Sequence, residues 1–555
     1  MDAVTRCCAA VRKPQSPQRL AALYCCIFVA LGCSVVSLGP AILELAVQTH
    51  STVTEAAYTQ GIRGFAYLVG GFSGPLYDRL PGHVLLSLYL LGGGLATALL
   101  PTATGWWGLA VLCVMQGLCL CGVDIGGNIL LLAAFDGAPG MAPWMQALHF
   151  AFALGAFIAP LLLRAVEAIT LAGRGEGADG DGHALAGQGT YTGAFVLMGC
   201  MCMAFAAFIQ LVPSPRKRAI AGSAAGGSGS SSKATEEVVL AVADGNADGG
   251  GAAWSTLVVL PEGSDGAAPP ATTSAQSAPA PAPVPAPAPA PTLASLSVAA
   301  ARTLSRRTWV VVIILSTMLC FYVGAETGFG FFATAYVVFA LGGSEASGNY
   351  MTSVFWGTIT LGRLAAVPLA SRVKPARLLV VTVGGSVVTM AIMLMAPYSP
   401  VVVWGGAAVF GLCMSSIYPT AVALTEGYMP IQGKHATAFV VGGSLGEWGL
   451  PFIIGTYIGG TITPTGEAVR SNDGGPGPII MLWVTAAGTA ITLAAFLALI
   501  RWGPAVHAMY KAAGLLHKDE SAPAATTEAT ATATDAAVAP ASMTSNPVAV
   551  SDAAS

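Results

Sequence analysis

Long apolar runs recur along the chain and constrain its fold more than any other feature. A helix needs about 20 apolar residues to cross a bilayer, and twelve runs meet this length. Only 9% of the residues are charged, whereas a soluble domain carries about 25%. The sequence therefore predicts an all-α membrane protein with twelve transmembrane helices. The expected spans are 20–47, 56–77, 83–101, 107–134, 144–166, 191–212, 308–340, 348–370, 377–397, 401–425, 436–459 and 478–501.

A long polar segment separates the first six spans from the last six. It contains the Gly/Ser tract SAAGGSGSSS and an Ala-Pro alternation, which are typical of flexible and extended linkers respectively. The tail beyond the last span is rich in Ala, Thr, Ser and Pro, a composition that favours disorder. The expected parts are a cytoplasmic N-terminus at 1–19, a six-helix bundle at 20–212, a disordered cytoplasmic linker at 213–307, a second six-helix bundle at 308–501 and a disordered cytoplasmic tail at 502–555.

Basic residues gather on one side of the predicted membrane. With both termini on that side, it holds nineteen Lys and Arg, while the other side holds Arg174 and Arg470. Cytoplasmic loops carry such an excess, so we expect both termini in the cytoplasm. The first apolar run is too long for a cleaved signal peptide. No retention or transit signal is evident, so the plasma membrane is the expected location.

The two halves of the chain repeat each other. PLYDRLPGHVLL at Pro75 matches PLASRVKPARLL at Pro368, GLCLCGVD at Gly117 matches GLCMSSIY at Gly411, and LGAFIAP at Leu154 matches LGEWGLP at Leu445. The offsets are 293, 294 and 291 residues. Three matches in one order and at nearly one offset predict two pseudo-symmetric bundles. In transporters built this way, the solute site lies between the repeats near the middle of the membrane.

Three carboxylates near mid-span are the strongest candidates for chemistry. Glu326 lies in FYVGAETGFGFF, where the glycines weaken the helix and let another backbone or a ligand approach. Asp124 is replaced by Tyr418 in the second repeat, and Glu447 has Ala156 as its counterpart in the first. Buried acids in membranes are costly and are rarely left without a partner or a function. These three are therefore predicted to bind a solute or an ion.

Several segments resemble known membrane carriers. GGFSGPLYDRLPGH is similar to the G-x-x-x-D-R-x-G-R/K motif between spans two and three of the major facilitator superfamily. Its Gly74, Asp78 and Arg79 match, whereas Gly82 comes one residue late and His83 replaces a basic residue. The segments GVDIGGNILLL, HFAFALGAFIAPLL, YVGAETGFGFF, TSVFWGTITLGRL, GLCMSSIYPTA and FVVGGSLGEWGLP look like the branch containing sodium-dependent glucose transporters, their orphan relatives and, more distantly, bacterial fucose permease. The likeness covers 20–212 and 308–500.

The resemblance implies roles for individual residues. Asp124 and Asn128 are four residues apart and share a helix face; fucose permease resembles this with an acid-x-x-x-Asn on the same span, where the acid is implicated in proton coupling. The alternative is a structural pair between helices. Gly74, Asp78 and Arg79 belong to the motif that latches the two bundles, and Arg363 is expected to join an equivalent latch.

Glu326 has two interpretations, a direct binding role or an ion pair with Arg63 or Arg363. Arg63 is expected to pair with an acid, bind solute or extend to the membrane surface. Glu447 with Trp448 suits a sugar, since an aromatic ring covers its C–H face while a carboxylate accepts from hydroxyls; packing is the alternative. Further candidates for lining the site are Trp356, Tyr322 and Gln60.

The same sequence argues against other classes of function. It contains no nucleotide loop, metal-ligand cluster or nucleophile triad, so we expect neither an enzyme nor a bound cofactor. A net charge of −3 argues against nucleic acid as a partner. The expected function is monomeric, secondary active transport of a small polar solute, most simply a monosaccharide, coupled to H⁺ or Na⁺. The alternatives are a carrier for a nucleoside or organic ion, and a non-transporting sensor or scaffold.

Overall fold

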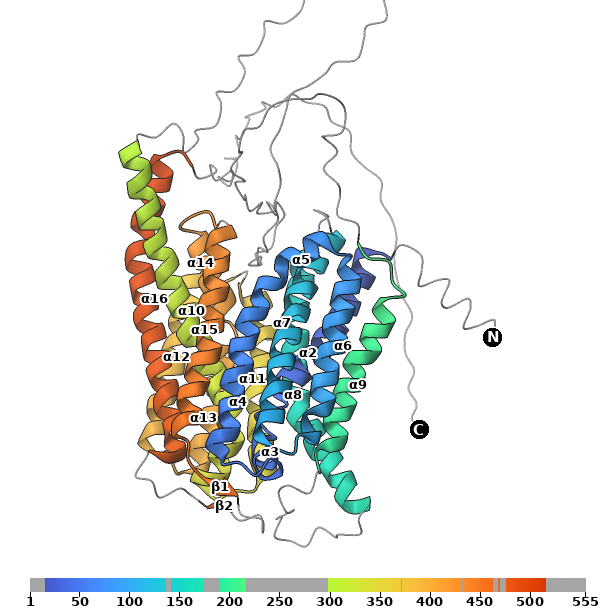
Figure 1. The fold of residues 1–555 in the computed structure, drawn as a ribbon. Helices are drawn as coiled ribbons and strands as arrows, with labels where there is room; N and C mark the ends of the chain where they lie inside the picture. Colours follow the sequence, from blue (N-terminus) through green and yellow to red (C-terminus); the bar gives the residue numbers. More distant parts are fainter. Residues whose placement is uncertain are drawn as a thin grey trace, which may run out of the picture. The chain divides into compact units, whose positions relative to one another are not determined.

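The computed structural model describes most of the two predicted bundles. The described residues are 15–135, 141–173, 190–215, 298–370, 372–431, 433–462, 468–469 and 476–515. Most of the linker, most of the tail and the residues before 15 lie outside this part. Long helices run side by side through the described chain (Figure 1).

The first half forms the predicted N-terminal bundle. Its α2 packs against α8, its α4 against α7, and its α6 against α9. Two short 3₁₀ turns, Gly71–Ser73 and Leu100–Thr102, follow α4 and α6. The α-helices are α2 (Pro17–Val36), α3 (Ile42–Gln48), α4 (Val53–Gly70), α5 (Gly74–Arg79), α6 (Gly82–Leu99), α7 (Trp106–Phe135), α8 (Met141–Gly173) and α9 (Thr192–Ile209).

The second half forms the other bundle, in which α10 packs against both α15 and α16. A 3₁₀ turn, Gly477–Ile479, precedes α16. A two-residue antiparallel pair, β1 (Thr461–Ile462) with β2 (Ala468–Val469), is a small departure from the predicted all-α fold. The helices are α10 (Val298–Leu341), α11 (Glu345–Ala370), α12 (Pro375–Met395), α13 (Pro400–Met414), α14 (Ile417–Glu426), α15 (Gly433–Tyr457) and α16 (Ile480–Ala512).

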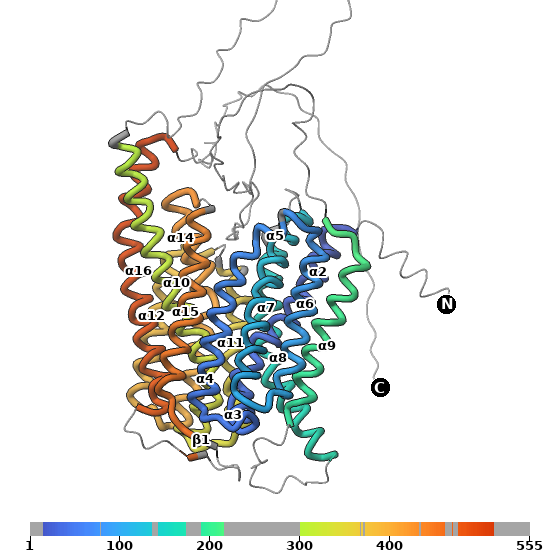
Figure 2. The backbone as a smooth tube through the Cα atoms, viewed as in Figure 1, coloured from blue at the N-terminus to red at the C-terminus, as the bar shows by residue number. Residues whose placement is uncertain are grey.

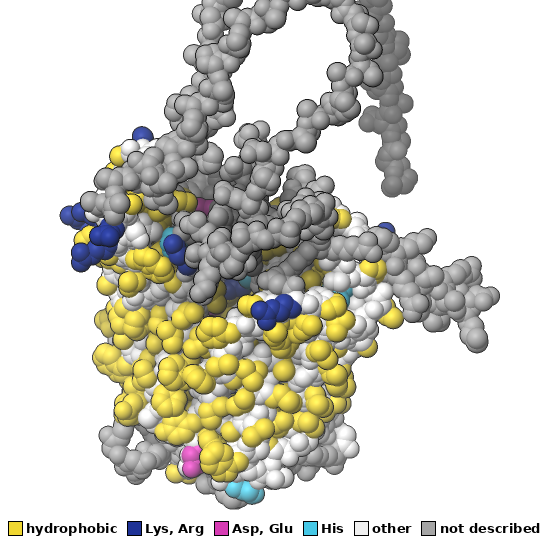
Figure 3. Space-filling model, turned by 45° about the horizontal axis from the view of Figure 1, so that its top comes forward, with side chains coloured by type: hydrophobic (Ala, Val, Ile, Leu, Met, Phe, Trp, Pro, Cys, Tyr) yellow, Lys and Arg dark blue, Asp and Glu magenta, His cyan; other side chains and the backbone are white. Residues whose placement is uncertain are grey.

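The predicted twelve-helix membrane fold is consistent with this arrangement. Among the described residues, ten helical segments are long and apolar enough to span a bilayer. The helices α4 and α11 do not reach that hydropathy because they carry polar residues such as Gln60, Arg63, Asn349 and Arg363. Both helices contact the opposite bundle, α4 against α15 and α11 against α8 (Figure 2). A broad apolar belt covers the face seen in Figure 3.

Prolines break two of the expected spans. The span predicted at 20–47 is wrong as one helix: α2 ends at Val36, and α3 begins at Ile42. Pro40 has no N–H to donate to the Val36 carbonyl four residues back. The span predicted at 401–425 is likewise divided between Met414 and Ile417 into α13 and α14, because Pro419 cannot donate to the carbonyl of Ser415.

The predicted edges of the linker and the tail are also wrong. Helix α10 begins at Val298, ten residues before the expected 308, and α16 continues to Ala512 instead of ending at 501. The two extensions pack on each other. The hydroxyls of Thr308 and Tyr510 lie 3.1 Å apart, and Tyr510 is buried. Leu304 of the α10 extension and Val506 of the α16 extension are buried in the same hydrophobic core, so tertiary packing accompanies both helices beyond the apolar runs that the sequence shows.

Glycines bring α10 and α15 into backbone contact. A Cβ on Gly446 would overlap the carbonyl of Cys320, and a Cβ on Gly442 would lie 2.5 Å from the oxygen of Ser316. From the other side, a Cβ on Gly324 would lie 2.8 Å from the oxygen of Gly446. The glycine-rich segment around Glu326 therefore permits close approach of a second helix, as its sequence predicts.

The two bundles are joined at the end that carries α3 and β1–β2, here called the hairpin end (bottom of Figure 1). Asn349 of α11 donates through Nδ2 to the Tyr191 hydroxyl, 3.0 Å away, just ahead of α9. The Val53 N–H donates to the Gly460 carbonyl across the bundles at 3.3 Å. Thr334 holds Asn349 in place by donating to its Oδ1 at 3.0 Å. The opposite end, where α2 begins and α16 ends, is called the terminal end.

The glycine contact makes a prediction about stability. Gly446→Ala places a methyl group against the Cys320 carbonyl, and such overpacking costs about 1–3 kcal/mol. At Gly449 of the same helix, nothing lies within 4 Å of the Cβ position. Thermal unfolding in detergent is therefore expected to show a lower midpoint for Gly446→Ala and no loss for Gly449→Ala. Equal losses in the two variants would contradict the contact.

The closure at the hairpin end makes a second prediction. Asn349→Ala removes a buried hydrogen bond between the bundles, worth about 1 kcal/mol or roughly fivefold in the opening equilibrium. Hydrogen exchange of the Val53 amide, which donates across the closure, should quicken accordingly. Thr389→Val is the control, because the buried Thr389 hydroxyl donates to the Gly385 carbonyl of its own helix, α12. Unchanged exchange in Asn349→Ala would argue against this closure.

Candidate functional site

The candidate site is built around charged side chains inside the membrane-spanning helices. Arg63 on α4 and Asp124 on α7 come from the first bundle. Glu326 on α10, Arg363 on α11 and Glu447 on α15 come from the second. Glu326 and Arg63 are only 6% and 5% exposed, so solvent does not compensate their charges. The contacts of each side chain therefore decide whether it is fixed in the structure or available to a ligand.

Glu326 is paired with Arg363. Its Oε1 lies 3.7 Å from Arg363 Nη2, and the Tyr322 side chain hydrogen-bonds within this pair. Of the two arginines left open by the sequence, Arg363 is thus the partner. Its Nη1 also donates to the backbone carbonyl of His149 on α8, 3.0 Å away. One arginine therefore links the central acid of the second bundle to the first bundle.

Asp124 is held by neutral partners. The Tyr67 hydroxyl on α4 donates to its Oδ2 at 2.9 Å. The Asn128 amide donates to the Asp124 carbonyl at 2.9 Å and to Oδ1 at 3.3 Å, which confirms that Asp124 and Asn128 share a helix face. The sequence reading missed Tyr67. Its spacing of four residues from Arg63 was the available signal, because such residues share a helix face.

Arg63 anchors a polar group within the first bundle. Its Nη1 donates to the Val35 carbonyl at 2.5 Å and to Gln116 Oε1 at 3.5 Å. Gln116, which the sequence reading also missed, is fully buried and donates to the Thr97 hydroxyl at 3.0 Å. Arg63 is thus fixed by hydrogen bonds inside its own bundle, and it does not extend to the membrane surface.

Glu447 differs from the other two acids. It lies within electrostatic range of Arg63, Asp124 and Glu326, yet no ion pair joins it to any described residue. Its backbone lies against α4, because a Cβ on Gly64 would sit 3.4 Å from the Glu447 carbonyl oxygen. This carboxylate therefore lies at the contact between the bundles without a fixed cationic partner among the described residues.

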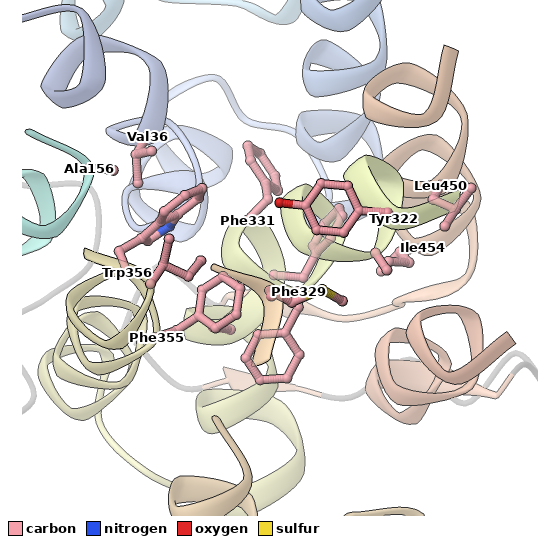
Figure 4. Close-up of a cluster of buried hydrophobic side chains, with 14 of the residues drawn as sticks. Val36, Ala156, Tyr322, Phe329, Phe331, Phe355, Trp356, Leu450 and Ile454 are labelled. Carbon is pink, nitrogen blue, oxygen red and sulfur yellow. The ribbon is translucent and has the colours of Figure 1, made fainter. Parts of the chain in front are cut away.

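Among the described residues, nine buried side-chain polar atoms lack hydrogen-bond partners, and three neutral ones lie on α4 and α11, which contact α15 and α8 of the opposite bundle. These three are Gln60 Oε1, Ser353 Oγ and Trp356 Nε1, and their residues are 2%, 3% and 5% exposed. Such orphaned groups cost about 1–3 kcal/mol each, so they often face a ligand. Trp356 lies close to Val36 of the first bundle (Figure 4). Two of these residues, Gln60 and Trp356, were candidates from the sequence.

Two other sequence candidates make mainly apolar contacts. Trp448 packs on Phe65, with ring centroids 5.9 Å apart, in an apolar groove of about 430 Å³. Apart from its hydrogen bond within the Glu326–Arg363 pair, Tyr322 belongs to the buried core that also holds the tilted rings of Phe329 and Phe355 (Figure 4). A sugar-stacking role for Trp448 remains a prediction, and packing is the role that its visible contacts support.

The predicted latch motif forms a short helix rather than an open loop. Gly74 begins α5 and Arg79 ends it, with the Arg79 side chain exposed; the side chain of Asp78 lies outside the described residues. His83, at the position of the usual basic residue, is buried. Its Nδ1 donates to the Val212 carbonyl at 2.9 Å, so Nε2 accepts from the Tyr24 hydroxyl at 2.8 Å. Gating by these residues and by Arg363 stays a prediction.

Metal binding finds no support in the described part of the chain, where no group of three or more His, Cys, Asp or Glu side chains could hold an ion.

Comparison with known proteins identifies the family to which this architecture is similar. The family model described as Major Facilitator Superfamily matches residues 22–456. The human sodium-dependent glucose transporter 1 is 26% identical over 440 residues, covering 79% of this chain and 73% of the relative. The human major facilitator superfamily domain-containing protein 4A is 25% identical over 461 residues, covering 78% and 85%. A crystal structure of a D-xylose-proton symporter shares the fold, with a TM-score of 0.55, 12% identity and coverage of 88% and 98%.

The family match spans both halves of the described chain, the two bundles and the buried charged residues between them. This integral, multi-pass membrane protein belongs to the major facilitator superfamily.

Proposed function

We propose that this protein is a secondary active carrier of a small neutral polyol, most simply a monosaccharide, driven by H⁺ or Na⁺. The observation that carries the proposal is a group of three acids and two arginines, Asp124, Glu326, Glu447, Arg63 and Arg363, on helices of both bundles. Arg164 and Glu167 on α8 form a separate ion pair. Buried charges of this kind mark ion and solute pathways. Relatives named sodium-dependent glucose transporter 1 support the same class of solute.

The neutral polar groups favour a hydroxylated solute. An acceptor at Gln60 Oε1, a donor at Trp356 Nε1 and a hydroxyl at Ser353 lack partners. A monosaccharide carries many hydroxyls, and each can both donate and accept a hydrogen bond. Gln60 belongs to the first bundle and the other two to the second. A solute bonded to both would sense their relative position, as alternating access requires.

Coupling would follow from charge balance. Asp124, Glu326 and Glu447 carry up to three negative charges, while Arg63 and Arg363 supply two positive ones. Within this group of five residues, full ionisation leaves one negative charge without compensation, and binding one cation removes it. Arg363 joins Glu326 to the first bundle through the His149 carbonyl, so a change of charge here alters a contact between bundles. Solute and cation would then stabilise the same state, which is the thermodynamic requirement for coupling.

The role of Asp124 is testable by uptake into proteoliposomes. Under an inward H⁺ or Na⁺ gradient, the wild type should concentrate radiolabelled hexose. Asp124→Asn should retain exchange of hexose across the membrane but lose gradient-driven accumulation, because the amide keeps the hydrogen-bonding shape without a charge. Glu55→Gln is the control: Glu55 is an exposed residue of the capping box that begins α4. Wild-type accumulation by Asp124→Asn would overturn the assignment.

The role of Trp356 predicts a change in solute affinity. Trp356→Phe removes the N–H donor and keeps an aromatic ring, so the KM for hexose should rise about 2- to 10-fold, the value of one hydrogen bond. Trp404→Phe on α13 is the matched control, since that side chain packs in the second bundle. A solute panel with nucleosides and organic ions identifies the preferred class. Equal KM values for the two variants would remove Trp356 from the site.

A further inference from the structure

A second groove lies between α10 and α15, close to the terminal end. It encloses about 330 Å³ and is lined mainly by apolar side chains, among them Trp309, Ile313, Val441 and Leu445. Ile313 is 60% exposed, Leu445 40% and Trp309 37%. The groove is therefore open along the outer surface of these spans, where it meets the hydrocarbon of the bilayer.

Each wall of the groove is one helical stripe. On α10, Trp309, Ile313 and Cys320 line the groove, and the spacing of 4, 7 and 11 residues keeps them on one face. On α15, Ala438 and Val441 do the same. Both helices begin at the terminal end and run into the membrane. On each helix, the residues that precede the groove therefore lie nearer the membrane surface.

Both stripes end in exposed cations. Arg306 precedes Trp309 by three residues, about 4.5 Å along the axis, and Lys434 precedes Ala438 by four. Both side chains are exposed. Residues three or four apart share a helix face, so a positive charge stands at the head of each wall. Lys and Arg side chains lie above the apolar belt on the face shown in Figure 3.

The top of the groove is held together by packing. The ring of Trp309 meets the ring of His435 edge-on, with centroids 5.5 Å apart and an interplanar angle of 88°. Lower down, α10 and α15 touch where Gly442 faces Ser316. Neither α10 before Glu326 nor the described part of α15 before Glu447 contains an acid, so these stretches provide no carboxylate to neutralise Arg306 or Lys434.

We propose that this groove binds one anionic glycerophospholipid, with an acyl chain along the apolar walls and the phosphate headgroup between Arg306 and Lys434. Trp309 lies between the charged and apolar parts, at the depth where tryptophan is enriched in membrane proteins. The terminal end is the side predicted to be cytoplasmic, and anionic lipids occupy that leaflet. The proposal depends on membrane insertion and on the predicted cytoplasmic side of the terminal end, and it is independent of the transported solute.

The groove that holds Trp448 and Phe65, described with the candidate site, supplies an internal comparison. It is lined by Gly61, Phe65, Val114, Trp448 and Phe452 among others. Acyl chains of any lipid would occupy it through hydrophobic contact. Neither groove has Lys or Arg in its lining, but the walls of the α10–α15 groove lead up to the exposed Arg306 and Lys434. The α10–α15 groove should differ by preferring an anionic headgroup.

Photo-crosslinking in vesicles tests this preference. Phosphatidylserine and phosphatidylcholine carrying the same diazirine acyl chain are compared, and adducts are mapped by mass spectrometry. Phosphatidylserine should label the peptides containing Ile313 and Val441 several-fold more than phosphatidylcholine, whereas the Phe65–Phe452 groove should be labelled equally by both. Excess unlabelled phosphatidylserine, but not phosphatidylcholine, should suppress labelling at Ile313 in the wild type, a result that needs no variant.

Variants that remove a positive charge then distinguish a specific headgroup site from general attraction of anionic lipid to surface cations. Arg306→Gln with Lys434→Gln should reduce phosphatidylserine labelling to the phosphatidylcholine level. Arg307→Gln is the matched control, because Arg307 is equally exposed but lies one residue off the stripe; it should keep the preference. Unchanged labelling at Phe65 shows that each variant is folded. Equal labelling by the two lipids in the wild type, or an equal loss in Arg307→Gln, would overturn the proposal.

Discussion

A charge buried among membrane-spanning helices costs several kcal/mol unless another group compensates it. In this protein that constraint acts on Glu326 first. The carboxylate is compensated by Arg363 at 3.7 Å, and the same arginine reaches the His149 carbonyl of the opposite bundle. The electrostatic requirement of one acid therefore becomes a contact between two halves of the molecule. Changing the charge of Glu326 would alter the interface as well as the local pair.

The remaining charged groups differ in how firmly they are held. Asp124 is fixed by Tyr67 and Asn128, and Arg63 by hydrogen bonds inside its own bundle. Glu447 has no ion-pair partner among the described residues and lies where α15 crosses α4. Close helix crossing at Gly64 makes this proximity feasible, because a larger residue there would meet the backbone of Trp448. The interface between the bundles thus has hydrogen-bonded charged groups, Asp124 and Arg63, close to a carboxylate, Glu447, that has no ion-pair partner among the described residues.

Predictions from the sequence were most successful where they used the thickness of the bilayer or the periodicity of a single helix. The apolar runs predicted the membrane helices, the internal repeat predicted two bundles, and the four-residue spacing predicted that Asp124 and Asn128 meet. These predictions failed where contacts between residues far apart in the sequence set the boundaries of a helix. The extension of α16 carries Tyr510, which meets Thr308 at the start of the apolar run of α10, about two hundred residues away in sequence. The breaks after Val36 and Met414 coincide with prolines that the sequence displayed, although a hydropathy count passes over them.

The sequence alone was enough to show that the chain is an assembly of membrane helices, because an apolar run of about 20 residues crosses hydrocarbon as a helix that satisfies its own backbone hydrogen bonds. It also identified nearly all of the charged residues at the candidate site, since an ionisable group in an apolar run is conspicuous. The partners of these side chains became known from the packing of the helices: Arg363 rather than Arg63 for Glu326, Tyr67 for Asp124, and Tyr191 for Asn349. Helix periodicity fixes which side chains share a face, but the packing of separate helices fixes which faces meet.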